Sequence, residues 1–585
     1  MSGAGQPSPE AGVTTGKRTV FALLATFAAG VLTFFPALRS PYLLDDYLHQ
    51  SMVDGNFPCK RGPFDLYDFV NDADRTIMIE RGILPWWADP ELKVRFFRPL
   101  SSLLLWIDHA VAGTYPFLLH LHSLAWWVAA VLAVRALFRH SFSPRVALLA
   151  MVIYALAPCH TLPLAWLANR EVLVCITFGT LALTAYVRFR EGRSLRHAAA
   201  ATALFFVSML GGEYALAFGG YVLAIELGRA HESLGQRMTG MLPFAVPAAG
   251  YLLVRGMLHY GTAGSGFYSD PLSVPGAYLA TAPRRLLILL EDAWFSIDAT
   301  TWSSSTPFWL LAAILVVGAA GLARPMRRVI ARLEPAQRAT ATWMLRGSVI
   351  ALLPTLAVVP SARLLGVSYL GVSALVALLL DHAWFPAQPE EGKGELLQLA
   401  AILLGFAHLV HGPATSWLVG RQFRDTGDEF SEHTKWFAKR LSDPENADVV
   451  LVRGLVGQFF VPFALDPHGK PPKRWRILTQ TGHILLLRTD ARSVRLTAPK
   501  DQSLFTTGPG NLFRSLDRPF RVGDEVRVPG MHVTIEELGE DGPRQALFEF
   551  DEDIEASKTV WFVENYDGFK DANLPTPGFG KPFDP

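Results

Sequence analysis

The sequence predicts an α-helical, polytopic membrane protein with a β-rich soluble domain at its C-terminus. Of its 585 residues, 50% are hydrophobic and 18% are charged, against about 25% charged residues in a typical soluble domain. Long uncharged apolar runs alternate with arginine clusters up to about Val419, and an ordinary polar mixture follows. Three cysteines and a net charge of +1 exclude a disulfide scaffold and provide no basic field for nucleic acid.

The apolar runs predict about 11 transmembrane helices, because a helix needs about 20 apolar residues to cross a bilayer. The first run is too long for the apolar region of a signal peptide, so we expect an uncleaved anchor. The runs, some of them marginally short, begin near Thr19, Tyr115, Val146, Val172, His197, Tyr214, Met238, Pro307, Gly347, Leu364 and Leu396.

The distribution of arginine predicts the orientation, because cytoplasmic loops carry an excess of basic residues. With the N-terminus inside, the inner loops are rich in arginine, and the short outer turns hold few, Arg170 and Arg363. We therefore expect a multi-pass protein of the cell membrane with residues 1–18 in the cytoplasm. After an odd number of spans, the C-terminal domain lies outside, in the periplasm if the cell is bacterial.

Three parts follow from this topology: the tail 1–18, the transmembrane domain 19–418 and the C-terminal domain 419–585. The transmembrane domain has two large outer loops, 39–114 and 258–306. In the second loop, Ala277 to Ile297 combines four charged residues with a Leu/Ile face, which predicts a helix lying in the membrane interface.

The C-terminal domain opens with a helix-like stretch, Glu429 to Leu441, and continues with short strand-like runs separated by Gly, Pro and Asp. The segment from Asn573 to Pro585 is rich in Pro and Gly and is expected to be irregular. The strand-like runs are Asp448 to Arg453, His483 to Arg488, Val494 to Leu496, Glu525 to Val528 and Ala546 to Phe550.

An acidic pair, Asp45-Asp46, follows the first span within a few residues of the membrane surface. Adjacent acids repel each other and a low-dielectric boundary raises their pKa, which suits a general base that acts on a hydroxyl. The alternative is a helix N-cap with an acid in the first turn, and the local pattern alone favours this cap.

Further along the first outer loop, Arg98-Pro99-Leu100 places an arginine beside a proline that starts a helix. Such an arginine can hold a phosphate through charge-assisted hydrogen bonds. The alternative is an arginine that extends its head group to the membrane interface, which base rates favour.

The order of these features resembles the GT-C membrane glycosyltransferases. It is most similar to the protein O-mannosyltransferases and to the transmembrane mannosyltransferases that carry TPR repeats, although no TPR period is present. The matching residues are Asp45-Asp46, Arg98-Pro99-Leu100, Tyr115-Pro116 with His120, Asn169-Arg170-Glu171, Gly212-Glu213 and Pro360-Ser361-Ala362-Arg363. Ser123, Trp127 and Gly212 depart from the pattern, standing where Asn, His and Lys are expected.

The resemblance implies a sugar, mannose or a similar hexose, moved from a polyprenyl-phosphate donor to a hydroxyl of a protein or lipid at the outer face, with inversion. Asp45 or Asp46 would be the base, and Arg98, Arg170 and Arg363 would hold the leaving phosphate in one cavity. With the resemblance, the catalytic interpretation of the acidic pair is favoured over the cap. Glu213, Asp108 and His120 are further candidates.

Several alternatives remain open at this stage. No cofactor is required, but a divalent cation near the acidic pair is one option, since some branches of the family use one. Competing functions are a transporter or flippase of a lipid-linked substrate and a non-catalytic, membrane-anchored binding protein.

A Cys59–Cys159 bridge competes with three unpaired thiols, which are favoured. Trp86 and Trp87 would stack on a sugar or, as we favour, form an interface belt.

Overall fold

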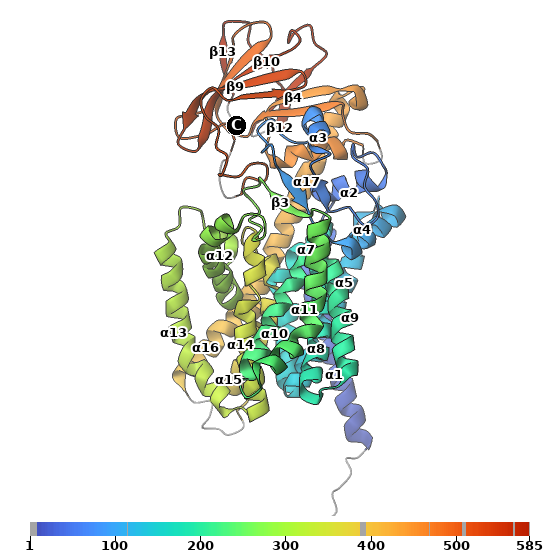
Figure 1. Ribbon diagram of the computed structural model, residues 1–585, viewed down its shortest axis with the longest axis vertical. Coiled ribbons are helices and arrows are strands. Elements are labelled where there is room, and N and C mark those ends of the chain that lie inside the picture. The colour runs from blue at the N-terminus through green and yellow to red at the C-terminus, as the bar shows by residue number, and fades with distance from the viewer. Residues whose placement is uncertain are drawn as a thin grey trace, which may run out of the picture.

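The computed structural model describes residues 9–113, 115–386, 394–466, 469–505, 510–565 and 568–583. A helical bundle forms one part of the molecule, and a β-rich domain lies at one end of it (Figure 1). The bundle helices are α1 (Pro9–Phe34), α5 (Pro116–Ser141), α6 (Pro144–Ala155), α7 (Thr161–Ala165), α8 (Glu171–Gly192), α9 (Leu195–Gly211), α10 (Gly219–Gly228), α11 (Leu234–Met257), α12 (Pro275–Phe295), α13 (Phe308–Arg332), α14 (Pro335–Ile350), α15 (Ser368–Trp384), α16 (Glu395–Phe406) and α17 (Gly412–Arg440).

Helix occupies each of the apolar runs that the sequence predicts as spans. Among the described residues, five helices are long and apolar enough to cross a membrane, or up to six if the bent pair Pro144–Ala155 and Pro158–Ala165 is one span. Shorter apolar helices cover Thr19–Phe34, Leu195–Gly211 and Ser368–Trp384. The chain is therefore a multi-pass membrane protein, and the number of about 11 spans stays a prediction.

Short helical turns connect the bundle helices, mostly at the end that faces the β-rich domain. These turns break several apolar runs, which is why fewer helices than runs have full spanning length. They are η1 (Ala37–Arg39), η2 (Pro158–His160), η3 (Leu167–Asn169), η4 (Glu213–Phe218), η5 (Ala299–Thr301), η6 (Leu353–Ala357), η7 (Ala362–Leu365) and the π-helical turn η8 (Ala407–His411).

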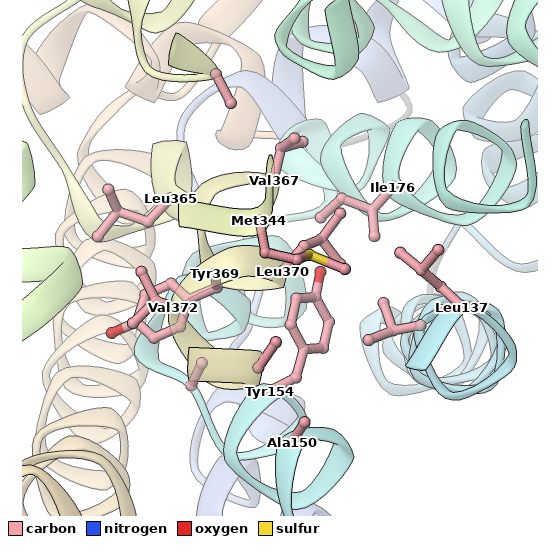
Figure 2. Close-up of a cluster of buried hydrophobic side chains, with 14 of the residues drawn as sticks. Leu137, Ala150, Tyr154, Ile176, Met344, Leu365, Val367, Tyr369, Leu370 and Val372 are labelled. Carbon is pink, nitrogen blue, oxygen red and sulfur yellow. The ribbon is translucent and has the colours of Figure 1, made fainter. Parts of the chain in front are cut away.

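The bundle core contains tyrosines whose hydroxyls bind backbone carbonyls on other elements. Figure 2 shows one part of it, where Tyr154 of α6 lies among Ile176, Met344 and Leu370 from three other helices. Close helix contacts depend on glycine where a large ring comes near. Gly30 of α1 faces the fully buried Trp127 of α5, and a Cβ on Gly30 would lie 2.3 Å from its ring.

The first outer loop holds α2 (Asp45–Val53), α3 (Arg75–Arg81) and α4 (Pro99–Ala112). Its strands β1 (Asp68–Val70) and β2 (Lys93–Arg95) form a small antiparallel sheet with β3 (Gly261–Ala263) of the second outer loop. This sheet joins two loops that are far apart in the sequence, and both lie at the end of the bundle next to the β-rich domain (Figure 1).

The C-terminal domain contains two sheets, ordered β13-β6-β7-β10-β9-β8 and β12-β11-β4-β5. All five predicted strand-like runs are strands, and the domain is β-rich as predicted. Its elements are η9 (Pro444–Asn446), β4 (Asp448–Arg453), η10 (Val456–Phe459), α18 (Val461–Ala464), β5 (Arg474–Thr479), β6 (Ile484–Arg488), β7 (Ser493–Thr497), β8 (Glu525–Val528), β9 (Met531–Gly539), β10 (Gly542–Phe550), β11 (Val560–Asn565), β12 (Gly568–Asp571) and β13 (Gly580–Phe583).

The final segment, Asn573 to Pro585, is predicted to be irregular. It contains a strand instead, β13, which pairs antiparallel with β6. Pro582 is tolerated there since β13 is an edge strand, and an edge residue without an N–H costs no ladder bond on its open side. The helix predicted from Glu429 to Leu441 is also longer than expected. It belongs to α17, which runs without a break across the predicted domain boundary at 418/419 and into the C-terminal domain (Figure 1).

The first outer loop and the C-terminal domain share one hydrophobic core. Trp87 is fully buried and stacks on Phe505 at 4.9 Å, and Trp86 donates from Nε1 to the Leu478 carbonyl over 3.0 Å. The sequence predicts that Trp86 and Trp87 stack on a sugar or form a belt at the membrane interface. Both predictions are wrong, because the two side chains lie inside the protein. The sequence of the loop alone does not indicate which surface covers them.

The predicted interface helix is α12, and Figure 1 shows it beside α13. Its charged residues Arg285, Glu291 and Asp292 are buried inside the protein instead of facing water. The amphipathic pattern therefore reflects packing against the bundle.

The three cysteines are buried and unbridged, so the Cys59–Cys159 bridge is not formed.

The contact between Gly30 and Trp127 gives a stability prediction. In an open helix position, Gly→Ala stabilises a helix by about 0.5–1 kcal/mol. At Gly30 the added methyl overlaps a rigid buried ring, and overpacking costs about 1–3 kcal/mol. We expect Gly30→Ala to lower the thermal unfolding midpoint in detergent. Gly250→Ala in α11, where nothing lies within 4 Å of the new Cβ, is the control and should not lower it.

Candidate active site

The turn η7, which carries Arg363, is fixed by tyrosines from three elements. Tyr154 of α6 donates to the Gly366 carbonyl at 3.0 Å, Tyr221 of α10 to Val367 at 2.9 Å, and Tyr214 of η4 to Leu364 at 3.2 Å. Arg363 itself has neither a hydrogen bond nor an ion pair with any described residue, and its guanidinium lies 6.0 Å from the Trp166 ring centre. These hydrogen bonds anchor a turn that presents an arginine whose guanidinium contacts the Trp166 ring but forms no hydrogen bond or ion pair with a described residue.

Arg98 lies at the start of α4 and forms the centre of a second charged group. Its Nε donates to Glu213 Oε2 at 3.0 Å, and its Nη1 to Glu171 Oε1 at 3.1 Å. Glu213 comes from η4 and Glu171 from α8. Arg98 and Glu213, two residues that the sequence analysis names as candidates, therefore form an ion pair. The Arg98 Nη2 group donates to no described residue.

Gly212 stands where the family that the sequence resembles has a lysine, and its backbone conformation gives a reason for the difference. Its φ is +153°, and a Cβ there would lie 3.2 Å from Arg98 side-chain atoms. A lysine would therefore be strained and would crowd Arg98. Arg98, which comes from another element, supplies the cation that pairs with Glu213.

The two members of the acidic pair have different environments. Asp46 is fully buried, and both of its oxygens accept backbone N–H groups, from Leu43 at 3.1 Å and from Ala168 at 3.0 Å. Burial raises the pKa of Asp46 to about 7, and these hydrogen bonds oppose that rise. Asp46 thus fixes the start of α2 to the turn η3, which is close to the cap role that the local pattern favours.

Asp45 forms no hydrogen bond or ion pair with a described residue. Burial raises its pKa to about 7, Arg363 opposes the rise, and Glu171 adds to it. The preceding Leu44 has φ +43° and ψ −103°, a strained backbone conformation of the kind found at functional sites. Asp45 is therefore a carboxylate that no described residue binds, and the charges of Arg363, Glu171 and Arg98 act on it.

Arg170 does not belong to this group, which corrects the prediction that three arginines converge. Its side chain is 2% exposed, and all of its nitrogens are occupied: Nε by Ser123 Oγ, Nη2 by the Leu119 carbonyl, and Nη1 by Asp108 and His122. Ser123, which departs from the family pattern, thus has a structural role. Arg170 and Asp108 form a buried ion pair that connects α4, α5 and α8.

His120 is also structural, since its ring nitrogens lie 2.8 Å from the Leu164 carbonyl and 3.0 Å from the Ser40 carbonyl. Among the described residues, no group of three or more His, Cys, Asp or Glu could hold a metal ion. The guanidinium of Arg98 binds the carboxylates of both Glu171 and Glu213.

Tyr268 is a residue of the site that the sequence did not reveal. Its ring lies 5.2 Å from that of Phe96, and its loop is joined to the segment before Arg363 by the Ser269 N–H to Ala357 carbonyl bond of 2.7 Å. Burial raises the pKa of Tyr268 to about 12, and the charges of Arg363, Asp45, Arg98 and Glu171 also act on it. A lone tyrosine in a Gly/Ser-rich loop gives no sequence signal for this position.

The comparisons with known proteins return similar solved structures only. No family model matches the chain, and no curated protein matches it. An oligosaccharyltransferase of Archaeoglobus fulgidus, tethered to an acceptor peptide, has a TM-score of 0.43 and 12% identity over 78% of this chain. This chain spans 63% of the length of that protein. The same enzyme, AglB, with an inhibitory peptide and dolichol-phosphate gives a TM-score of 0.43 and 12% identity over 78% of this chain and 64% of that one.

ArnT of Cupriavidus metallidurans, bound to undecaprenyl phosphate, has a TM-score of 0.41 and 13% identity. The match covers 77% of this chain and 85% of ArnT. Similarities at this level do not define a function, and the function proposed below rests on the residues of the site.

The different environments of Arg170 and Arg363 give a prediction. Removing one partner of a buried ion pair costs about 3–5 kcal/mol, whereas a side chain without protein partners is replaced at a cost within about 0.5 kcal/mol. We expect Arg170→Gln to lower the thermal unfolding midpoint strongly and Arg363→Gln to leave it near that of the parent protein. Equal shifts in the two variants would show that Arg363 has a structural partner.

Proposed function

We propose that this protein is an inverting glycosyltransferase of the GT-C type. It would move a hexose such as mannose from a polyprenyl-phosphate donor to a hydroxyl of a protein or lipid acceptor. The single observation that carries the proposal is the carboxylate of Asp45, which no described residue binds and on which the charges of Arg363 and Arg98 act, at one end of a membrane-embedded bundle. A donor whose lipid lies in the bilayer would present its sugar phosphate at this depth.

In the proposed reaction Asp45 is the general base. It takes the proton from the acceptor hydroxyl as that oxygen attacks the anomeric carbon of the sugar. The bond between this carbon and the phosphate oxygen breaks on the opposite side, so the configuration inverts. A pKa of about 7 for Asp45 suits this role, because a base works best when its pKa lies near the working pH.

Arg363 and Arg98 would stabilise the leaving phosphate as negative charge develops on it. Arg363 has no protein partner to give up, so the phosphate would gain a full charge-assisted interaction. Arg98 is held in place by Glu171 and Glu213 and retains its free Nη2 edge. The two arginines differ in this respect, so Arg363 should contribute more to donor binding, and Arg98 should also contribute to the shape of the site.

The acceptor would reach the site from the side of the C-terminal domain. Segments of that domain bind both outer loops next to the site. The Asp89 N–H donates to the Phe513 carbonyl at 2.8 Å, and the Gly266 N–H to the Asn511 carbonyl at 2.8 Å. Because Tyr268 lies two residues after Gly266, the C-terminal domain is positioned to influence which acceptor enters.

The central prediction concerns Asp45→Asn. This variant keeps the size of the side chain and removes its basicity, and loss of a positioned base costs about 10²–10⁴ in rate. We expect folded protein with sugar transfer reduced by that factor, assayed in membranes with a polyprenyl-phosphate sugar donor. In the parent protein, activity should rise with pH through about 7, because Asp45 must be deprotonated, and the residual activity of the variant should lack this rise.

Asp65→Asn is the matched control, since Asp65 is an exposed acid of the same outer loop, and it should transfer sugar normally. Asp46→Asn should differ from both variants. An amide would direct an N–H at one of two backbone N–H donors, so this variant should lose stability. Full activity of Asp45→Asn would rule out the general base.

The orientation of the protein is part of the proposal and has its own test. The native cysteines are all buried, so single cysteines can be introduced at the exposed residues Ala556 and Ala336. We expect a membrane-impermeant thiol reagent added to intact cells to label Ala556→Cys and not Ala336→Cys. The opposite labelling would place the acidic pair on the cytoplasmic side and contradict transfer at the outer face.

A further inference from the structure

Helix α12 ends inside the bundle with a buried carboxylate that forms no ion pair with a described residue. This carboxylate belongs to Asp292, which lies in the last turn of the helix and is 2% exposed. The Ala299 N–H approaches Asp292, but Asp292 Oδ2 has no hydrogen-bond partner among the described residues. The end of α12 lies beside the spanning helix α13, because a Cβ on Gly318 would contact the Phe295 ring. The proposed glycosyl transfer does not use Asp292.

Ser296, the residue that ends α12, occupies a position that favours glycine. Its φ is +53° and its ψ is +35°, in the left-handed region where a helix commonly ends in glycine. Its hydroxyl is buried and has no hydrogen-bond partner in the described part of the chain. A buried polar group without a partner costs free energy, and a glycine would avoid both this cost and the backbone strain. The Ser296 hydroxyl therefore lowers stability unless a ligand binds it.

A second hydroxyl, from another helix, lies at the same place. The Tyr369 hydroxyl of α15 lies near the Ser296 side chain, and the charge of Asp292 acts on it. Tyr369 is fully buried, and none of the described residues lies at hydrogen-bonding distance from its hydroxyl. Figure 2 shows that this hydroxyl points away from Tyr154. Three oxygens from two helices thus surround the end of α12 without hydrogen-bond donors of their own.

The π-helical turn η8 adds an acceptor to this region. The His408 ring lies 5.9 Å from the Tyr369 ring, and His408 Nε2 lies 3.2 Å from the Trp294 carbonyl. A carbonyl only accepts, so Nε2 carries the proton and Nδ1 is left as an acceptor. Nδ1 is buried and has no partner among the described residues. Every unsatisfied atom around the end of α12 can therefore offer an electron pair, which is what a cation requires.

We propose that the end of α12 binds a monovalent metal cation, with Asp292 as the charged ligand and Ser296 and Tyr369 as hydroxyl ligands. The C-terminal end of a helix carries partial negative charge, which favours a cation. Helices that end inside membrane proteins coordinate sodium in this manner. One carboxylate among neutral oxygens matches a single positive charge. A divalent ion is not favoured, because no group of three or more His, Cys, Asp or Glu among the described residues could hold a metal ion.

A proton on Asp292 is the alternative way to neutralise this buried carboxylate. A protonated carboxyl has a single O–H to donate. It could satisfy either the Ser296 or the Tyr369 hydroxyl, but not both. A metal cation can bind all three oxygens at once, which is why we favour it.

The test measures the thermal unfolding midpoint of the full-length protein in detergent. The midpoint is followed in sodium, potassium and choline chloride at equal ionic strength, since choline is too large for a buried site. A ligand that binds only the folded state raises the midpoint with its concentration. We expect sodium or potassium to raise the midpoint above its value in choline, and the larger increment identifies the ion. Asp292→Asn should abolish the increment.

Ser296→Gly separates cation binding from helix stability. In choline chloride, this variant should not have a lower midpoint than the parent protein, because glycine fits the left-handed conformation and removes an unpartnered hydroxyl. Loss of even an outer partner of a metal ion lowers affinity about 10–100-fold. We therefore expect Ser296→Gly to need at least about tenfold more cation for the same increment. An unchanged requirement would overturn the role of the hydroxyl and the proposal with it.

Glu291→Gln is the matched control. Glu291 is also buried, but successive side chains of a helix point about 100° apart, so this variant should keep the increment. Three outcomes would overturn the proposal: equal midpoints in all three salts, an undiminished increment in Asp292→Asn, or an equal loss in Glu291→Gln. If Asp292→Asn does not fold, Ser296→Gly decides. Because no readout involves sugar transfer, failure here and failure of the glycosyltransferase proposal are distinguishable.

Discussion

The arrangement of the candidate site depends on the ion cluster of Arg98 with Glu171 and Glu213. These residues come from the first outer loop, α8 and η4, so the cluster joins three parts of the chain at one point. Glu171 is buried, and Arg98 and Glu213 are half-buried, so breaking the cluster leaves charges that water only partly compensates. The cluster therefore fixes where α4 starts and holds Arg98 within electrostatic reach of Asp45. The open backbone at Gly212 is what permits this approach.

A second constraint is the shared core of the first outer loop and the C-terminal domain. The loop buries Trp86 and Trp87 only because the sheets of that domain cover them. The domain in turn is carried by α17, a helix continuous with the bundle. The strained Leu44, which precedes Asp45, packs against this shared core. A strained conformation persists when its surroundings over-determine it, and this packing supplies that condition.

Charged residues occur at both ends of the bundle, but their pairing differs. Arg170 is fully occupied by protein acceptors and stabilises the fold, whereas Arg363 has no described partner and is available to a ligand. At the opposite end, Arg145 forms an ion pair with Asp381 at 3.5 Å and is largely exposed. An arginine with few protein partners is the type of residue that can bind a phosphate without first losing other bonds.

The sequence by itself determined the helical membrane class, the β-rich domain and the strands within it, because hydrophobic length and alternation are local properties. The family resemblance predicts Asp45, Asp46, Arg98, Arg170 and Arg363 as site residues and Glu213 as a further candidate, and of these Arg98 and Glu213 form an ion pair. Only the tertiary structure decided that protein groups occupy every nitrogen of Arg170, that Asp46 accepts two backbone hydrogen bonds while Asp45 accepts none from a described residue, and that Tyr268 lies beside Phe96. Each of these depends on which groups from distant segments form hydrogen bonds or contacts with a given side chain. Sequence spacing does not record that information, because such partners meet only when the bundle and the C-terminal domain pack together.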